Sequence, residues 1–193
     1  MITKKTKKEE ESRQKAQVER DRQRRSKNFK VIVNSQAVFQ ISAQDKNRVF
    51  SDWVVSTGKY LSGYSKGLPR VPERLKPNAV CLLTERPKDV PEAQRRIIGA
   101  FMVESDFFGD ECKDGLIRAH ETYRIALREE AYLPFWSYFA ESVQPKWGNT
   151  AYKYFSNQVM QSILQDMIAG STQEEKENIQ SFNRYFRKLN RFS

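Results

Sequence analysis

The sequence predicts an α+β fold: a small, mostly antiparallel β-barrel, followed by a pair of helices and preceded by a charged helical arm. Three observations lead to this prediction. Short β-branched and aromatic runs alternate with turn residues in the middle of the chain, two helical patterns close it, and the N-terminal segment is almost without apolar residues. We expect residues 29–193 to form one domain, with the barrel over 29–127 and the helices over 151–190.

The charged arm covers residues 1–28. It holds eleven Lys or Arg against five Asp or Glu, and so carries +6 of the formal net charge of +10. Neither Gly nor Pro interrupts its good helix formers from residue 4 to residue 27. No apolar stripe runs along it, however, so packing cannot stabilise a helix, and the arm is expected to be helical or disordered.

The first part of the barrel begins with two predicted strands. Residues 29–33 and 37–42 are rich in β-branched and aromatic side chains, with a short turn between them that would make a hairpin. Apolar residues then recur at helical spacing over 45–54. A helix is expected there, with either Ser42 or Asp45 as its N-terminal cap.

The second part of the barrel follows a basic loop. Residues 58–77 contain three Gly, three Pro and five Lys or Arg. The apolar runs 79–84 and 96–104 are predicted to be central strands, and the glycine inside the second run suits a curved sheet. A further strand is expected at 123–127, where apolar and polar residues alternate.

Two helices are predicted to close the chain. Residues 152–169 carry apolar side chains at every fourth position, and Gly170 stands where a C-terminal cap belongs. Thr172 and Glu175 form the capping-box signature of the second helix. The predicted apolar faces consist of Phe155, Val159, Ile163 and Met167 on the first helix, and of Ile179, Phe182, Phe186 and Leu189 on the second.

No enzyme motif is present in the sequence. It has no Gly-rich phosphate loop, no nucleophile elbow and no recognisable set of converging carboxylates. Cys81, Cys112 and the single His120 are too few for a disulfide framework or a zinc site. A hydrolase that uses His120 beside Glu121 is the last of our hypotheses. We expect no catalytic residue, no metal and no cofactor.

The sequence also predicts where the protein acts. Reduced, structural cysteines are typical of the cytosol. No stretch approaches the ~18 apolar residues of a membrane span, and no hydrophobic run follows the basic N-terminus as in a secretory signal. We therefore expect a cytoplasmic, non-secreted protein without a membrane partner.

The basic residues predict a nucleic-acid partner, DNA or RNA, because clustered cations bind phosphates by releasing counterions. Two alternatives stay open for residues 1–28: a solvated charged tail, and a helix that docks on a partner protein. The cations of the loop can equally be simply solvated. The candidate phosphate-binding residues are Lys4, Lys5, Lys7, Lys8, Arg20, Arg22, Arg24 and Arg25 on the arm, and Lys66, Arg70, Arg74 and Lys76 on the loop.

Three tryptophans are candidates for stacking on bases. Trp53 lies among the apolar residues of a predicted helix and is expected in the core. For Trp136, core and surface are equally plausible, since the neighbouring aromatics already supply core side chains. Trp147, beside a Gly-Asn pair, is expected to be the most exposed of the three.

The order of elements over residues 38–103 carries a family resemblance. A strand ending in Phe-Gln-Ile-Ser leads into a helix and a basic loop, then Arg-Leu-Lys-Pro-Asn-Ala-Val at 74–80 enters a strand, and Arg-Ile-Ile-Gly-Ala-Phe-Met-Val follows at 96–103. This order resembles the PUA-like superfamily, particularly its EVE and ASCH branches. There a lysine-proline-glycine-aspartate turn introduces a barrel strand, and an isoleucine-x-glycine-x-x-x-valine strand follows. The chain departs from that turn, with Asn78-Ala79 in place of glycine-aspartate.

The resemblance covers about a third of the chain and implies a small barrel with flanking helices. Such barrels often read a modified or flipped base through an aromatic pocket. By position, Ser42, Trp53 and Phe107 would line that pocket, with Trp136 as a further aromatic candidate. Two functional hypotheses follow: a nucleic-acid-binding protein, and a non-catalytic subunit of a larger assembly anchored by residues 1–28.

Overall fold

The computed structural model describes residues 4–139 and 145–192, and the chain divides into two compact units, Met1–Lys30 and Val31–Ser193. The first unit is helix α1, Lys4–Lys27. Its side chains are exposed from Glu10 to Arg25, and its polar residues hydrogen-bond along the helix surface, as Gln17 does to Asp21. A helix that is polar on all sides has no apolar face to bury, so α1 is stabilised mainly by its own backbone hydrogen bonds.

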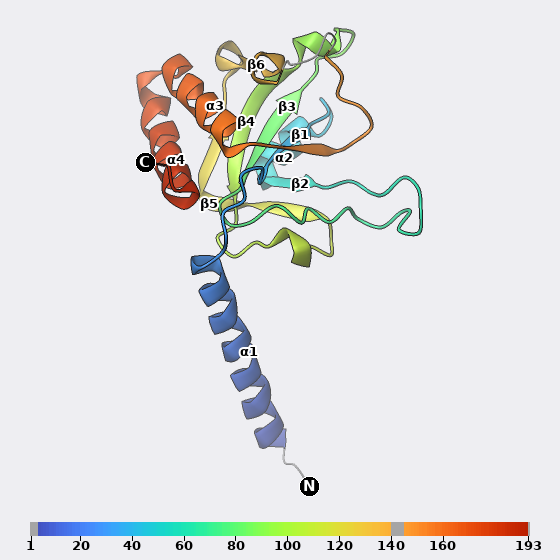
Figure 1. Ribbon diagram of the computed structural model, residues 1–193, viewed down its shortest axis with the longest axis vertical. Coiled ribbons are helices and arrows are strands. Elements are labelled where there is room, and N and C mark those ends of the chain that lie inside the picture. The colour runs from blue at the N-terminus through green and yellow to red at the C-terminus, as the bar shows by residue number, and fades with distance from the viewer. Residues whose placement is uncertain (1–3, 140–144, 193) are drawn as a thin grey trace. The chain divides into compact units, whose positions relative to one another are not determined.

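The second unit is α+β, with a curled mixed sheet and helices (Figure 1). The described strands follow the order β2-β5-β4-β3-β1-β7, and β6 pairs with β4 beside this path. The strands are β1 Gln36–Gln40, β2 Val54–Ser56, β3 Val80–Glu85, β4 Arg96–Val103, β5 Leu116–Ala126, β6 Leu133–Pro134 and β7 Tyr152–Phe155. The helices of this unit are α2 Lys46–Asp52, α3 Asn157–Gly170 and α4 Gln173–Asn190, with short 3-10 helices at Glu92–Gln94, Gly109–Glu111, Glu129–Ala131 and Phe135–Tyr138.

The prediction of an α+β fold is thus confirmed, whereas the mostly antiparallel barrel is not. β1 runs parallel to β3, because α2 and β2 lie between them in the chain and carry it back to the same end of the sheet. The other strand pairings among the described residues are antiparallel. The sheet curls without closing, and β2 and β7 stand at the two ends of the strand order.

A glycine and a bulge produce the curvature of the central strands. The β3–β4 register shifts between Leu83 and Thr84, which inserts an extra residue on the β4 side. A Cβ on Gly99 would lie 2.4 Å from the carbonyl oxygen of Ile125 and 3.0 Å from the ring of Phe50. Glycine is therefore required where Ile125 of β5 and Phe50 of α2 approach β4 closely.

The first predicted hairpin is absent. Residues 29–33 form no strand, and the carbonyl groups of Ile32 and Val33 instead accept hydrogen bonds at the start of α3. The backbone N–H of Asn157 donates to the carbonyl of Val33 at 2.9 Å, and its Nδ2 donates to the carbonyl of Ile32 at 3.1 Å. These carbonyls find partners at a helix start, so the β-branched composition of this segment does not lead to a sheet.

The first of the two C-terminal helices differs from the prediction at both ends. Residues 152–155 form β7 and pair with β1, and α3 begins only after Ser156, whose Oγ accepts from the backbone N–H of Val159 at 3.2 Å. Gly170 is the last residue of α3 rather than its cap, which is Ser171. The capping box at the start of α4 is confirmed.

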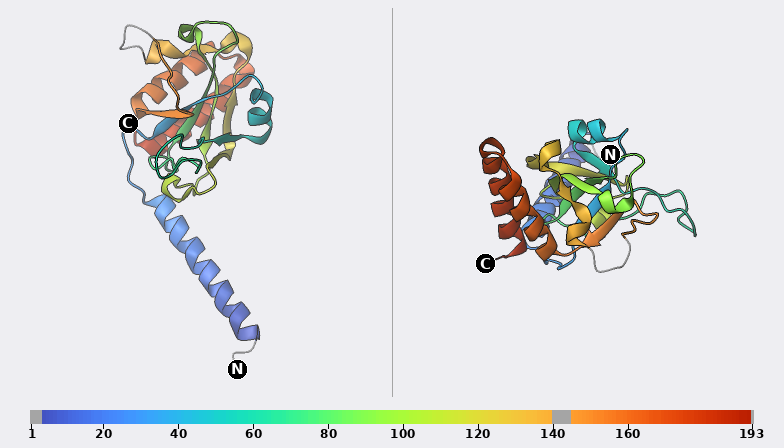
Figure 2. Two further views of the ribbon diagram at one scale, coloured as in Figure 1. Left: turned by 90° about the vertical axis from the view of Figure 1, so that its right-hand side faces the viewer. Right: turned by 90° about the horizontal axis from the view of Figure 1, so that it is seen from above.

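The core has two parts because side chains alternate across the sheet. In β3, Val80 and Leu82 belong to one cluster, together with the apolar faces of α3 and α4. Cys81 and Leu83 belong to the other, inside the curl of the sheet. Both views of the ribbon show α3 and α4 lying on the same side of the sheet (Figures 1 and 2). Within the described residues, no helix is both long and apolar enough to cross a membrane.

Candidate nucleic-acid interface

Residues 58–70 form a hairpin-like extension between β2 and β3, which projects from the sheet in Figure 1 and in the right-hand view of Figure 2. The backbone N–H of Tyr60 donates to the carbonyl of Leu68 at 3.0 Å. The tip is closed by a turn in which Lys66 N–H donates to the carbonyl of Gly63 at 3.2 Å. Gly63 has a φ of +77°, which favours glycine at this position.

The positive charge of the second unit is concentrated in and beside this extension. Residues 29–193 contain 23 Lys or Arg and 19 Asp or Glu. Residues 58–77 contain five of those cations and a single carboxylate, that of Glu73. The net +4 of this segment equals the net charge of residues 29–193, so the rest of that range is neutral overall. Such a local excess attracts a polyanion.

The four loop residues predicted to bind phosphate have different surroundings. Lys76 Nζ is paired with Asp110 Oδ1 at 2.8 Å, so its charge is largely neutralised. The Arg70 guanidinium lies 5.5 Å from the ring centroid of Tyr60, and that of Arg74 lies 5.1 Å from the ring of Tyr154. Lys66 is exposed near the tip of the extension.

Strand β7 contributes two tyrosines to the same surface. Tyr152 and Tyr154 point to one side of the strand, with ring centroids 5.4 Å apart. Tyr154 Oη accepts from the backbone N–H of Arg74 at 3.3 Å, and Tyr152 Oη donates to the carbonyl of Val71 at 3.4 Å. Because Arg70 and Tyr60 also act electrostatically on Tyr152, five side chains form one continuous set. We call Tyr60, Arg70, Arg74, Tyr152 and Tyr154 the tyrosine–arginine surface.

Both β7 phenols stay protonated near neutral pH. Burial raises the pKa of Tyr152 well above its ordinary value, and neighbouring Tyr154 raises it further, while Arg70 opposes the change. Burial likewise raises the pKa of Tyr154, against hydrogen bonds that lower it. The surface therefore presents neutral, partly buried rings beside positive guanidinium groups. Tyr152 is itself stacked on Phe39, with ring centroids 5.3 Å apart, and both β7 tyrosines pack against the core cluster inside the curl.

On the arm, the four predicted arginines lie in the second half of α1. Arg20, Arg22, Arg24 and Arg25 are exposed. The side chains of Lys4, Lys5, Lys7 and Lys8 lie outside those that the structure describes.

The residues suggested for a base pocket lie in different places. Trp53 and Phe107 both pack against the core cluster inside the curl. Trp136 packs against the other cluster, with its Nε1 donating to the carbonyl of Glu92 at 2.7 Å. Ser42 is exposed, and its Oγ lies 2.6 Å from a carboxylate oxygen of Asp45. The structure thus brings Trp53 and Phe107 to one side of the sheet and places Trp136 on the other.

Trp53 is half-buried and has an unusual backbone. It follows α2 with φ at +54°, in the left-handed region. Its ring meets Phe101 edge-on at 6.3 Å, and the Arg124 guanidinium lies 5.7 Å from it. The expectation of a core role agrees with these contacts. The prediction that the helix continues to Val54 is wrong, because β2 begins at that residue.

Trp147, expected to be exposed, is buried, with 4% of its surface accessible. The guanidinium of Arg95 lies 4.3 Å from the indole, and Trp147 Nε1 donates to the carbonyl of Thr150 at 2.7 Å. Arg95 is itself 1% exposed and is held by both oxygens of Glu92 and by Gln40. A buried cation needs such partners, and the loop folds back to provide one of them.

His120 lines a surface pocket with Glu104, Ser105, Asp106 and Glu121. Its Nδ1 accepts from the backbone N–H of Thr122 at 3.1 Å. Burial lowers the pKa of His120, against the effect of Glu121. Among the described residues, no group of three or more His, Cys, Asp or Glu could hold a metal ion.

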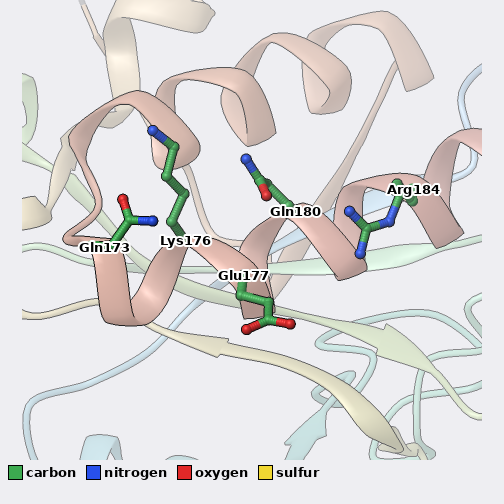
Figure 3. Close-up of a pocket in the computed structure, with 5 residues that line it drawn as sticks. All are labelled: Gln173, Lys176, Glu177, Gln180 and Arg184. Atoms are coloured by element: carbon green, nitrogen blue, oxygen red, sulfur yellow. The ribbon is translucent and has the colours of Figure 1, made fainter.

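A second pocket lies on the outer face of α4 (Figure 3). Its lining side chains are polar and of mixed charge, and Figure 3 shows them spread along the helix rather than converging. They are Gln173, Lys176, Glu177, Gln180 and Arg184. This arrangement is typical of a solvated helix face, and we assign no ligand to it.

Comparison with known proteins adds no assignment: no protein-family model and no curated protein matched the chain.

Composition and spacing did not identify the tyrosines of this candidate surface. Tyr152 and Tyr154 were assigned to a helix, although their alternation with Lys153 is also the period of a strand. Tyr60 lies in a loop rich in glycine and lysine, where an aromatic residue has no core to join. An aromatic side chain within a basic, Gly-containing loop is the signal that could have identified it.

Proposed function

We propose that the protein binds nucleic acid through residues 58–77 and the tyrosines of β7, with α1 adding phosphate affinity. The observation that carries this proposal is the concentration of net positive charge in residues 58–77, whose two arginines each lie against a tyrosine ring. Cations supply affinity for phosphates, and planar groups supply stacking on bases.

The proposal includes a PUA-like relationship and the reading of a modified or flipped base. The curled sheet supports it, as does the half-buried Trp53 on the same side of the sheet as Phe107. It also includes a cytoplasmic location, supported by the two free, buried thiols of Cys81 and Cys112.

The test is oligonucleotide binding as a function of salt. Fluorescence anisotropy is measured with mixed-sequence DNA and RNA at about 50 mM and about 200 mM salt. The variant replaces Lys66, Arg70 and Arg74 with Ser and leaves Lys76 in place, because Lys76 is paired with Asp110. We expect weaker binding and a salt slope lower by about 2–3 units, since each phosphate contact contributes about 0.9.

A matched control removes three exposed cations elsewhere: Lys88→Ser, Arg184→Ser and Lys188→Ser. It changes the net charge by the same amount but should leave most of the salt slope unchanged. If both triple variants lose binding equally, the affinity for nucleic acid depends on the net charge of the protein and not on this surface. The assignment of the interface is then wrong.

The second candidate function is that of a non-catalytic subunit anchored in an assembly by α1. It is favoured by α1 forming a unit of its own with exposed side chains. If the wild type binds no oligonucleotide even at low salt, this function replaces the first. Deletion of residues 1–28 should then abolish co-purification with partner proteins, and nuclease treatment should not.

A further inference from the structure

The tip of the 58–70 extension exposes apolar side chains that folding does not explain. Leu61 is 70% exposed, Leu68 is 58% exposed and Tyr64 is fully exposed, at 108% of the reference surface. Tyr64 occupies the turn between Gly63 and Lys66, so it stands at the end of the extension farthest from its base. An exposed aromatic side chain at such a point gains nothing from the core and is available to a ligand.

We infer that Tyr64 stacks on an unpaired nucleobase, so that single-stranded or locally unpaired nucleic acid is the preferred ligand of the extension. This inference rests on the proposed function and specifies its ligand. A base within a duplex has both faces covered by its neighbours, whereas an unpaired base offers a face to an aromatic ring. Lys66, two residues from Tyr64, supplies a cation for the adjacent phosphate.

The planar side chains below the tip continue the same arrangement. Tyr60 lies against Arg70, and Arg74 lies against Tyr154. Two ring–guanidinium pairs therefore lie below the tip, and they offer further planar and positively charged groups to the same strand. Their chemistry is tolerant of sequence, because every base has a π-face.

A lipid surface is the main competing ligand, because exposed leucines beside cations also suit a bilayer interface. Two observations favour nucleic acid. The two arginines of residues 58–77 each lie against a tyrosine ring, an arrangement that a lipid headgroup does not need. The basic helix α1 has no apolar face, whereas a helix that lies in a membrane surface requires one.

The experiment uses the full chain with a 12-nucleotide strand that carries 2-aminopurine, alone and annealed to its complement. We expect the wild type to bind the single strand more tightly than the duplex and to change the 2-aminopurine fluorescence. Tyr64→Ala should weaken single-strand binding by about 5- to 100-fold, the usual effect of removing one stacking ring. Its salt slope should not change, because no phosphate contact is lost.

Two control variants accompany it. Tyr64→Trp should retain the affinity and the fluorescence change, since the ring is kept. Val33→Ala removes an apolar side chain that is 64% exposed outside this extension, and it should have no effect.

The outcomes separate this inference from the proposed function. If the wild type binds oligonucleotides with a steep salt slope but Tyr64→Ala binds equally well, the inference is wrong and the proposed function stands. If the wild type binds single strand and duplex with equal affinity, the inference is again wrong and the proposed function stands. If the wild type binds no oligonucleotide, both are wrong. If vesicles of anionic phospholipid displace the single strand and Tyr64→Ala loses the vesicles, the ligand of the tip is a lipid.

Discussion

Asn78 and Asn190 form a reciprocal hydrogen-bonded pair inside the second unit. Asn78 Nδ2 donates to Asn190 Oδ1 at 2.6 Å, and Asn190 Nδ2 donates to the carbonyl of Asn78 at 3.0 Å. Both residues are buried. The pair joins the entry to β3 to the last residue of α4, and Asn78 also donates to Ser35 Oγ at 2.9 Å. The side chain of Asn78 thus donates two of these three hydrogen bonds, and its main-chain carbonyl accepts the third.

The Asn78–Asn190 pair predicts a measurable coupling. Asn190→Ala should lower the free energy of unfolding by about 1–3 kcal/mol, because it leaves a buried amide and a buried carbonyl without this partner. Asn78→Ala should cost a similar amount, and the double variant should cost less than the sum of the two. Urea denaturation measures all three. The exposed Lys188→Ala is the control, and strict additivity would contradict the coupling.

Phe182→Ala should lower the free energy of unfolding by about 3–5 kcal/mol, the usual loss for a buried phenylalanine. Phe182 is fully buried in the cluster that includes the apolar faces of α3 and α4, and it meets Tyr123 edge-on at 6.3 Å. Urea denaturation provides the measurement, with Arg184→Ala on the exposed face of α4 as the control. A change under about 0.5 kcal/mol would mean that the ring does not stabilise the unit.

Deletion of residues 1–28 should leave the melting temperature of the remaining protein within about 2–4 °C of the full chain, the shift produced by about 1 kcal/mol at this size. The physical reason is that α1 belongs to a separate unit and has no apolar face to bury. Thermal denaturation followed by circular dichroism tests this, and loss of the cooperative transition would show that the arm is part of the folded core.

His120 should make stability depend on pH in the mildly acidic range. Its folded-state pKa is lowered by burial and then by Arg124, with Glu121 opposing, from the ordinary value of 6.5. Stability is therefore fully present above pH 6.5 and is lost as pH falls through the lower folded-state pKa, because the unfolded chain binds the proton first. His120→Gln should flatten this part of the profile. The test measures the unfolding free energy of both proteins at pH 5, 6, 7 and 8. Identical profiles for the wild type and His120→Gln would exclude His120 as the cause.

The elements that the sequence predicts well are those whose signal is local. β3 and β4 are continuous apolar runs, and the capping box at Thr172 marks the start of α4 within the chain itself. β7 was missed because Phe155 stands four residues before Val159, so a strand and the following helix shared one apolar spacing. The parallel pairing of β1 with β3 has no local signal, since hydropathy does not encode strand direction.

The residues of the candidate interface likewise differ in whether a local signal in the sequence identifies them. Arg70 and Arg74 were found from charge, which is a property of one segment. Tyr154, the neighbour of Arg74, could be placed only from the fold, because it lies 80 residues from Arg74 in the chain. Trp147 was assigned to the surface because its neighbours are turn residues, whereas its burial depends on Arg95 in a distant segment.

The position of β1 in the sheet has a consequence for synthesis of the chain. Phe39 is aligned with Leu83 on one side and with Tyr152 on the other, so β1 can pair with β3 long before β7 leaves the ribosome. At about 5–20 residues per second, the interval between these strands lasts several seconds. During that time the nascent sheet presents the unpaired edge of β1, whose residues are mostly buried in the finished protein. Slowing translation after β5 should therefore increase aggregation or chaperone capture of the nascent chain, and arrival of β7 ends this exposure.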